Sequence, residues 1–163
     1  MAAESLIRPI FFILLTLSML ILVPRERIYA LTFFGLTAGV LLAVVIQIIA
    51  VHILKLWYFN YLVPLWDFFN LPTFIILSWG VAEILFAHLL PRNSIIMAFL
   101  FILAFSLGST LVEWFFNKKN LIIFLRWQAL LTFFLALFIH IPLGYYLIQK
   151  DKLIKNIHIR RKT

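Results

Sequence analysis

Cysteine is absent from this 163-residue sequence, and charged residues make up only 12% of it. Without cysteine there can be no disulfide, no iron–sulfur ligation and no thiolate metal site. Hydrophobic residues make up 65%, and mean hydropathy is +1.10. Residues 28–51 carry no charged side chain, and eighteen or more such residues are enough to cross the roughly 30 Å hydrocarbon core of a bilayer. The sequence therefore predicts an integral membrane protein with no stretch left for a soluble catalytic domain.

Short polar breaks divide the chain into five apolar runs. We expect membrane helices at residues 9–23, 28–53, 72–90 and 94–116, and a fifth from the 117–120 break to about residue 148. Residues 56–70 are rich in aromatic side chains and contain Pro64, which is typical of a segment at the membrane interface. The predicted fold is an all-α, five-span helix bundle over residues 1–148, followed by a basic tail at 149–163.

The net charge of +8 is interpreted as membrane topology, and no nucleic-acid partner is expected. Basic residues favour the cytoplasmic side of a membrane. With the C-terminus inside, nine basic residues lie on that side and five outside, so we expect an N-out, C-in protein of the cell membrane. Six of the nine are in the tail, where they would contact anionic lipid headgroups or dock a partner protein: Lys150, Lys152, Lys155, Arg160, Arg161 and Lys162.

Small residues recur at four-residue spacing in the second predicted span, at Gly35, Gly39 and Ala43. Such a stripe lets the backbone of a neighbouring helix approach closely. It predicts a helix-packing surface rather than a chemical site.

Ionisable residues inside a bilayer are costly and invite a functional hypothesis. Glu113 and Arg126 flank the break between the last two predicted spans, and we expect them to be neighbours. The pair either fixes the register of two helices or forms the wall of an outward-facing polar site. Further members of this candidate site are Ser106, Ser109, Thr110 and Trp127.

A second candidate pair is Glu83 with His140, which have similar expected depths in the inner half of the bundle. Such a pair either relays protons or holds two helices together. A third group belongs to the outer rim. His52 and Asp67 lie where charges are inexpensive, and ordinary interfacial polarity explains them. Trp57 and Trp66 belong to a cluster of tryptophans that either forms an interfacial belt or lines an outward-facing pocket.

No cofactor or metal is expected. A bis-histidine haem needs two ligands at one depth, but His88 and His140 differ by about six residues, roughly 9 Å along a helix. His52 belongs at the opposite rim and His158 in the tail. Metal-ligand spacings such as HxxxH, phosphate loops and nucleophile elbows are also absent.

Four short motifs resemble an uncharacterised family of small multi-pass membrane proteins from spore-forming Gram-positive bacteria. They are PRERIYA after the first span, LKLWYF closing the second, LVEWFFNKKNLI around Glu113, and Arg126-Trp127. Phe124 stands where the family commonly has a tyrosine. The resemblance implies a bacterial inner-membrane location and a role for the Glu113 region. It implies no particular activity.

These features lead us to expect an accessory subunit that binds a ligand or a membrane-protein partner, or that assembles with copies of itself. A transporter or channel component is the alternative, and a continuous polar cavity between the two faces would distinguish it. An intramembrane enzyme acting on a lipid or isoprenoid is the third possibility. Its sign would be an apolar pocket with a carboxylate at one end.

Overall fold

A computed structural model describes the backbone of residues 3–63 and 67–160 and the side chains of residues 4–63 and 67–150. Of the residues whose backbone and side chain are both described, 77% are helical. Four of its helices are long and apolar enough to cross a membrane, in agreement with the all-α prediction. Trp66 lies outside the described residues.

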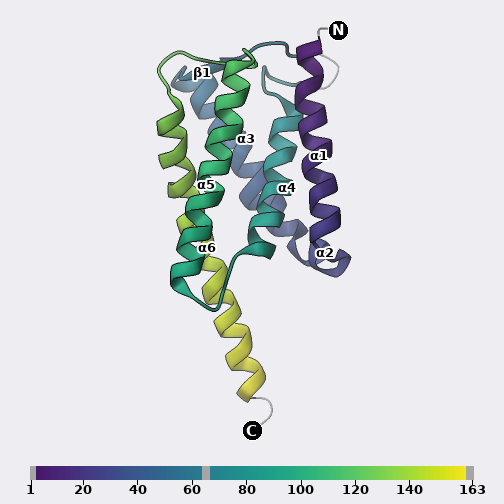
Figure 1. Ribbon diagram of the computed structural model, residues 1–163, viewed down its shortest axis with the longest axis vertical. Coiled ribbons are helices and arrows are strands. Elements are labelled where there is room, and N and C mark those ends of the chain that lie inside the picture. The colour runs from purple at the N-terminus through teal and green to yellow at the C-terminus, as the bar shows by residue number, and fades with distance from the viewer. Residues whose placement is uncertain (1–2, 64–66, 161–163) are drawn as a thin grey trace.

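The helices alternate in direction along a bundle (Figure 1). A 3-10 turn, η1 (Ala3–Leu6), leads into α1 (Ile7–Leu22). The next helix, Arg25–Ile53, is continuous over 29 residues. It comprises α2 (Arg25–Phe34), a π-helical segment η2 (Gly35–Leu41), α3 (Leu42–Gln47) and a second π-helical segment η3 (Ile48–Ile53).

Three helices complete the bundle: α4 (Thr73–Leu89), α5 (Ile95–Lys118) and α6 (Ala129–Arg160). The 17-residue α4 is the shortest of these three, and it is not among the four helices of membrane length. At 1.5 Å per residue it extends about 25 Å. The N- and C-termini lie at opposite ends of the molecule (Figure 1).

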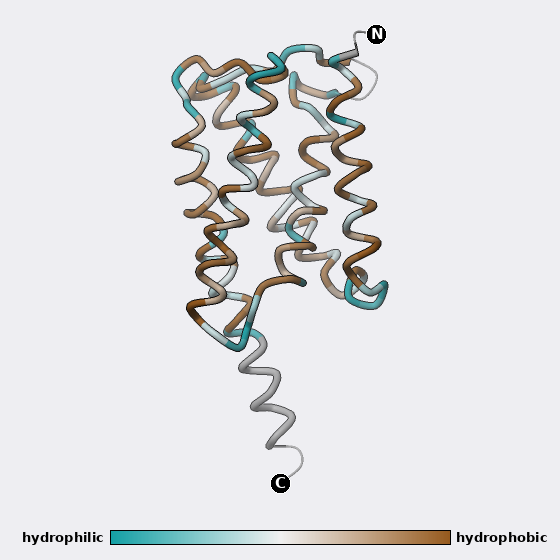
Figure 2. Tube along the Cα trace, in the orientation of Figure 1, coloured by the Kyte–Doolittle hydropathy of each residue, from teal (hydrophilic) through white to brown (hydrophobic). Residues whose placement is uncertain are grey.

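Large hydrophobic side chains cover the outside of the bundle. Ile21, Phe33 and Phe138 are each more than three-quarters exposed. Figure 2 shows hydrophobic residues along the helices and hydrophilic residues gathered at the two ends. This distribution suits a surface in contact with lipid, because so large an apolar surface would be unfavourable in water.

The stripe of small residues packs against α4. A Cβ atom on Gly39 would lie 2.5 Å from the Cα atom of Gly80, and one on Gly35 would lie 2.8 Å from the carbonyl oxygen of Gly80. Ala43 is completely buried. Backbone meets backbone here, and only glycine fits at the crossing.

A small antiparallel sheet closes the end of the bundle that carries the N-terminus. Strand β1 (Trp57–Phe59) pairs with β2 (Ile122–Phe124), with Tyr58 opposite Ile123. We call this end the sheet end, and the opposite end, where α6 leaves the bundle, the tail end. The sheet corrects two expectations. The aromatic segment is partly a strand, and the last helix begins at Ala129 rather than directly after residue 120, because residues 122–124 form backbone hydrogen bonds with β1.

Arg8 of α1 ties this sheet to the first helix. Arg8 is only 2% exposed. It donates hydrogen bonds to the backbone carbonyl groups of Asn60, Leu121 (2.7 Å) and Tyr61 (3.2 Å). Three carbonyl acceptors satisfy a cation that would otherwise be costly to bury.

Two helical groups make up the bundle. In the first group, α4 packs against both α1 and η2, and in the second, α5 packs against α6. The groups meet in a sheet-end cluster that includes Trp57, Ile75 and Phe116. They meet again toward the tail end, in a cluster that includes Phe86 and Ile102. Between these two clusters the groups separate.

Candidate functional site

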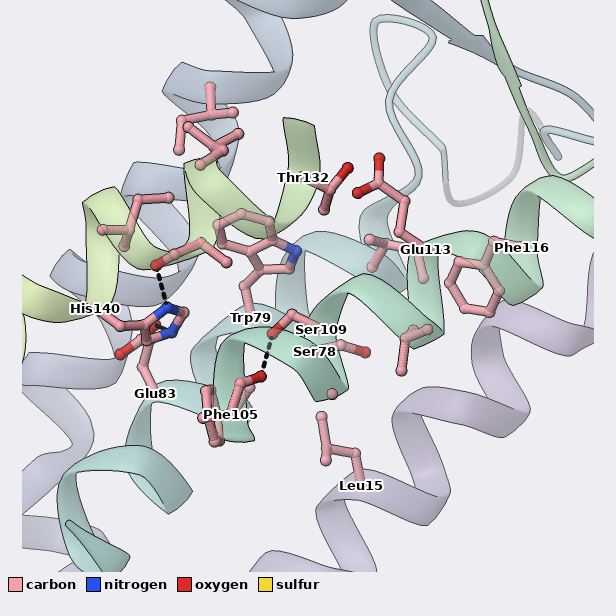
Figure 3. Close-up of a pocket in the computed structure, with 18 of the residues that line it drawn as sticks. Leu15, Ser78, Trp79, Glu83, Phe105, Ser109, Glu113, Phe116, Thr132 and His140 are labelled. Atoms are coloured by element: carbon pink, nitrogen blue, oxygen red, sulfur yellow. Dashed lines mark hydrogen bonds and ion pairs between the residues drawn. The ribbon is translucent and has the colours of Figure 1, made fainter. Parts of the chain in front are cut away.

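A cavity of about 530 Å³ lies between the two helical groups, with walls from α1, α3, α4, α5, α6 and both strands. Aromatic rings form much of its lining: Phe11, Trp57, Trp79, Phe101, Phe105 and Phe116. The only titratable side chains among the described residues that line it are Glu83, Glu113 and His140. The cavity is therefore an apolar chamber with a few polar groups (Figure 3).

Glu113 of α5 occupies the part of the cavity nearer the sheet end. Its carboxylate interacts with the Thr132 hydroxyl of α6, and Figure 3 shows the two side chains side by side. The Thr132 oxygen in turn accepts a hydrogen bond of 2.8 Å from the Trp127 indole Nε1. Two neutral groups therefore orient the carboxylate: the Thr132 hydroxyl directly, and the Trp127 indole through that hydroxyl. In Figure 3 the indole nitrogen of Trp79 also faces this end of the cavity.

The expected ion pair between Glu113 and Arg126 is wrong. Both residues lie in the described part of the chain, and no ion pair joins them. Arg126 is exposed and stands in the connection between β2 and α6, where its backbone N–H donates to Leu56. Strand β2 is formed by residues 122–124, which were expected to belong to the last helix. Arg126 therefore lies outside the last helix rather than along its face.

Glu83 of α4 and His140 of α6 are in contact. Oε1 of Glu83 lies 3.0 Å from Nε2 of His140, and both side chains are almost fully buried. His140 Nδ1 lies 2.7 Å from the Ala136 carbonyl oxygen, which can only accept, so Nδ1 carries a hydrogen. The hydrogen bond between Nε2 and Oε1 then requires one further proton, held by either atom. Glu83 Oε2 has no hydrogen-bond partner among the described residues.

Aromatic rings hold this pair in place. The rings of Phe86 and Phe105 meet the His140 imidazole edge-on at 4.9 and 5.0 Å between centroids. Phe86 is completely buried. The low-dielectric surroundings strengthen the Glu83–His140 interaction and raise the cost of losing either partner.

The two carboxylates are well separated. Thr132, which binds Glu113, and His140, which binds Glu83, are eight residues apart on α6, or about 12 Å along a helix. The hydroxyl groups of Ser78 and Ser109 line the cavity but donate to carbonyl oxygens in their own helices, at 2.7 and 3.1 Å. The chamber therefore provides neither a continuous polar path nor two carboxylates at working distance.

The remaining predicted residues contribute to structure rather than to the cavity. Thr110 donates to the Ser106 carbonyl oxygen. Ser106 is fully buried, with a hydroxyl oxygen that has no partner among the described residues. At the rim, Asp67 accepts hydrogen bonds from the backbone of Val63 and Thr73, which orders the start of α4. His52 bonds to the Phe69 carbonyl oxygen.

Trp57 is the one predicted rim residue in the described chain that reaches the cavity. It is 4% exposed. Its ring meets the Trp127 ring edge-on, with 5.2 Å between centroids, and its Nε1 donates a 3.1 Å hydrogen bond to the Gln47 side-chain oxygen. Gln47 was not among the predicted site residues, although it is the only side-chain amide in residues 28–51. Arg8 and Thr132 were also missed, because their partners are distant in the sequence.

Comparisons with protein-family models, with curated proteins and with solved structures find no match to this chain. Among the described residues, no three His, Asp or Glu side chains gather closely enough to hold a metal ion.

Proposed function

We propose that this protein is a bacterial cell-membrane protein that binds an elongated apolar molecule, such as a lipid or isoprenoid, in the cavity between its two helical groups. One observation carries the proposal: the cavity has apolar walls and a volume of about 530 Å³. Ligand sites typically measure 300–1,000 Å³ and combine apolar walls with a few orienting polar groups. The Glu113–Thr132 pair is suited to orient a polar head.

Within this proposal the protein acts as a ligand-binding or accessory subunit. It assembles with a membrane-protein partner or with a second copy of itself. The transporter alternative is weaker, because apolar walls separate the polar groups near the two ends of the cavity. A lipid-acting enzyme is the second candidate. It is favoured by the Glu113 carboxylate at one end of an apolar pocket, where an acid or base would meet the head of a chain-like substrate.

We further propose five spans in an N-out, C-in orientation. The 17 residues of α4 lie at the lower limit for a spanning helix. Charge supports the orientation, because the tail end carries Arg25, Arg27 and Arg92 in addition to the basic tail. At the sheet end, Arg8 is buried against carbonyl groups, so fewer free charges remain there to oppose this bias.

The cavity proposal is tested by filling the cavity from Gly108. This residue lines the cavity, and a Cβ atom added to it would meet no other atom within 4 Å. We expect Gly108→Leu to project into the cavity and exclude ligand. Gly108→Ala is the matched control, since it raises helix propensity similarly but adds one methyl group.

The measurement is native mass spectrometry of the full chain purified from membranes in mild detergent. The wild type and Gly108→Ala should retain a bound apolar molecule that Gly108→Leu lacks. Equal retention by folded Gly108→Leu would mean that the molecule binds elsewhere, and the cavity proposal would be wrong.

A further inference from the structure

The charges of the cavity indicate a class of ligand. We propose that the cavity binds a hydrophobic cation, which is an amine or onium group carried on an apolar body. The positive charge would lie against Glu113 and the apolar body along the aromatic walls. This inference rests on the proposed binding function of the same cavity and adds the sign of the ligand's charge.

The charges of the cavity lining are unbalanced. Among its described residues the lining has neither lysine nor arginine, and its histidine, His140, pairs with Glu83. Glu113 is therefore the one lining carboxylate that has no basic partner among the described residues. The carboxylate of Glu113 interacts with the hydroxyl of Thr132, which carries no formal charge, and Arg126 does not pair with it. An ionised carboxylate in an apolar chamber is costly unless a cation accompanies it. A cationic ligand supplies that partner, whereas a fatty acid or an anionic phospholipid would place like charges together.

Aromatic rings form the cavity wall around Glu113. Phe116 lies beside Glu113, and the Trp79 ring lies across the cavity from the carboxylate's own helix (Figure 3). Aromatic faces attract cations through their ring quadrupole, and tryptophan does so most strongly. Carboxylate and ring therefore favour the same sign of charge, and the ring surfaces also accommodate the apolar body.

The other polar pair of the cavity, Glu83 with His140, also favours a ligand that donates. Glu83 lines the cavity and is only 2% exposed, yet its Oε2 atom has no partner among the described residues. Buried acceptors are normally satisfied. The free oxygen therefore favours a ligand that brings a donor or a positive charge, and it disfavours a second anionic group at this end.

The test compares two ions of nearly equal size and shape and opposite charge, tetraphenylphosphonium and tetraphenylborate. Each is equilibrated with the full chain in nanodiscs of zwitterionic lipid, and binding above that of empty nanodiscs is measured by equilibrium dialysis. The variants are Glu113→Gln, which removes the charge and keeps the shape, and Gly108→Leu, which fills the cavity. Glu26→Gln, an exposed carboxylate at the start of α2, is the control.

We expect saturable binding of the phosphonium to the wild type and to Glu26→Gln, about tenfold or more weaker binding to Glu113→Gln, and none to folded Gly108→Leu. The borate should show no saturable binding. Unfolding temperature of each variant identifies loss of fold.

Equal binding of both ions, lost in Gly108→Leu but unchanged in Glu113→Gln, would overturn the charge preference and leave the cavity's binding function intact. Phosphonium binding that survives in Gly108→Leu would also overturn the inference, because the ion would bind elsewhere. If neither ion binds, the inference is wrong. The proposed binding function would be wrong as well only if, in the native mass spectrometry experiment, folded Gly108→Leu retains the co-purified molecule.

Discussion

Glu83 Oε1 and His140 Nε2 lie 3.0 Å apart and join the two helical groups through a buried hydrogen bond. Glu83 belongs to α4 in the first group, and His140 belongs to α6 in the second. This polar link lies beside the cavity, between the sheet-end cluster and the cluster toward the tail end. It therefore connects the groups where apolar packing between them is interrupted.

Removing one partner of this pair should be more harmful than removing both. We expect Glu83→Ala or His140→Ala to lower the free energy of unfolding by about 3–5 kcal/mol, because the remaining group is left buried and unpaired. The double change to leucine should cost less than the sum of the single changes. The control is His88→Ala, which is on the same helix and only partly buried. Single changes as mild as this control would show that the pair contributes little.

The glycines of the two groups should respond oppositely to a side chain. Gly39→Val should prevent α4 from reaching the Arg25–Ile53 helix, because a Cβ atom would lie 2.5 Å from backbone that cannot move aside. Gly108→Ala should be neutral or stabilising by roughly 0.5–1 kcal/mol. The monodisperse yield on size-exclusion chromatography and the unfolding temperature measure both effects. A well-folded Gly39→Val protein would contradict the close helix crossing.

Arg8 should control the order of the sheet end. Arg8→Met removes a donor from each of three backbone carbonyl groups, and of these the Leu121 carbonyl keeps a second donor, the Asn60 N–H. Hydrogen exchange should increase in residues 57–61 and 120–124 and change little in α4. Arg126→Met, at an exposed position nearby, is the control and should show wild-type exchange. Equal effects of the two changes would mean that loss of positive charge, rather than of the Arg8 contacts, loosens the sheet.

Exchanging the charges of Glu113 and Arg126 should give no rescue. Because the two residues form no ion pair, Glu113→Arg and Arg126→Glu should have independent effects on yield and unfolding temperature. The Glu113 change should be severe, since it places a long cation against Thr132 within the cavity. A double variant more stable than Glu113→Arg alone would show that the residues interact after all.

The absence of cysteine makes the proposed orientation directly testable. A single cysteine replaces either exposed Lys119 at the sheet end or exposed Asn93 at the tail end. In intact cells a membrane-impermeant maleimide should label Lys119→Cys, and it should label Asn93→Cys only after the membrane is permeabilised. The reverse pattern would contradict the N-out, C-in proposal. Labelling of both positions in intact cells would contradict a membrane crossing by α5, the one helix between them.

Local composition was sufficient to predict the helices and their order. Apolar runs mark α1, the Arg25–Ile53 helix, α5 and α6. Such runs form helices because a segment inside a membrane must satisfy its backbone hydrogen bonds internally. The four-residue spacing of Gly35, Gly39 and Ala43 indicated a packing stripe, because the helical period places these residues on one face. Glu83 and His140 were paired by their similar depth, which follows from helix rise alone.

Pairings between distant residues depend on the tertiary structure. Strand β2 forms because residues 57–59 lie beside it, and neither segment reads as a strand by itself. That pairing moves the start of α6 to Ala129, takes Arg126 out of the helix and brings Thr132 to Glu113. Arg8 finds its acceptors 52 to 113 residues away. The cavity itself arises because apolar packing between the two helical groups is interrupted between the sheet-end cluster and the cluster toward the tail end. A sequence pattern indicates which face of a helix is apolar but not which neighbouring helix covers it.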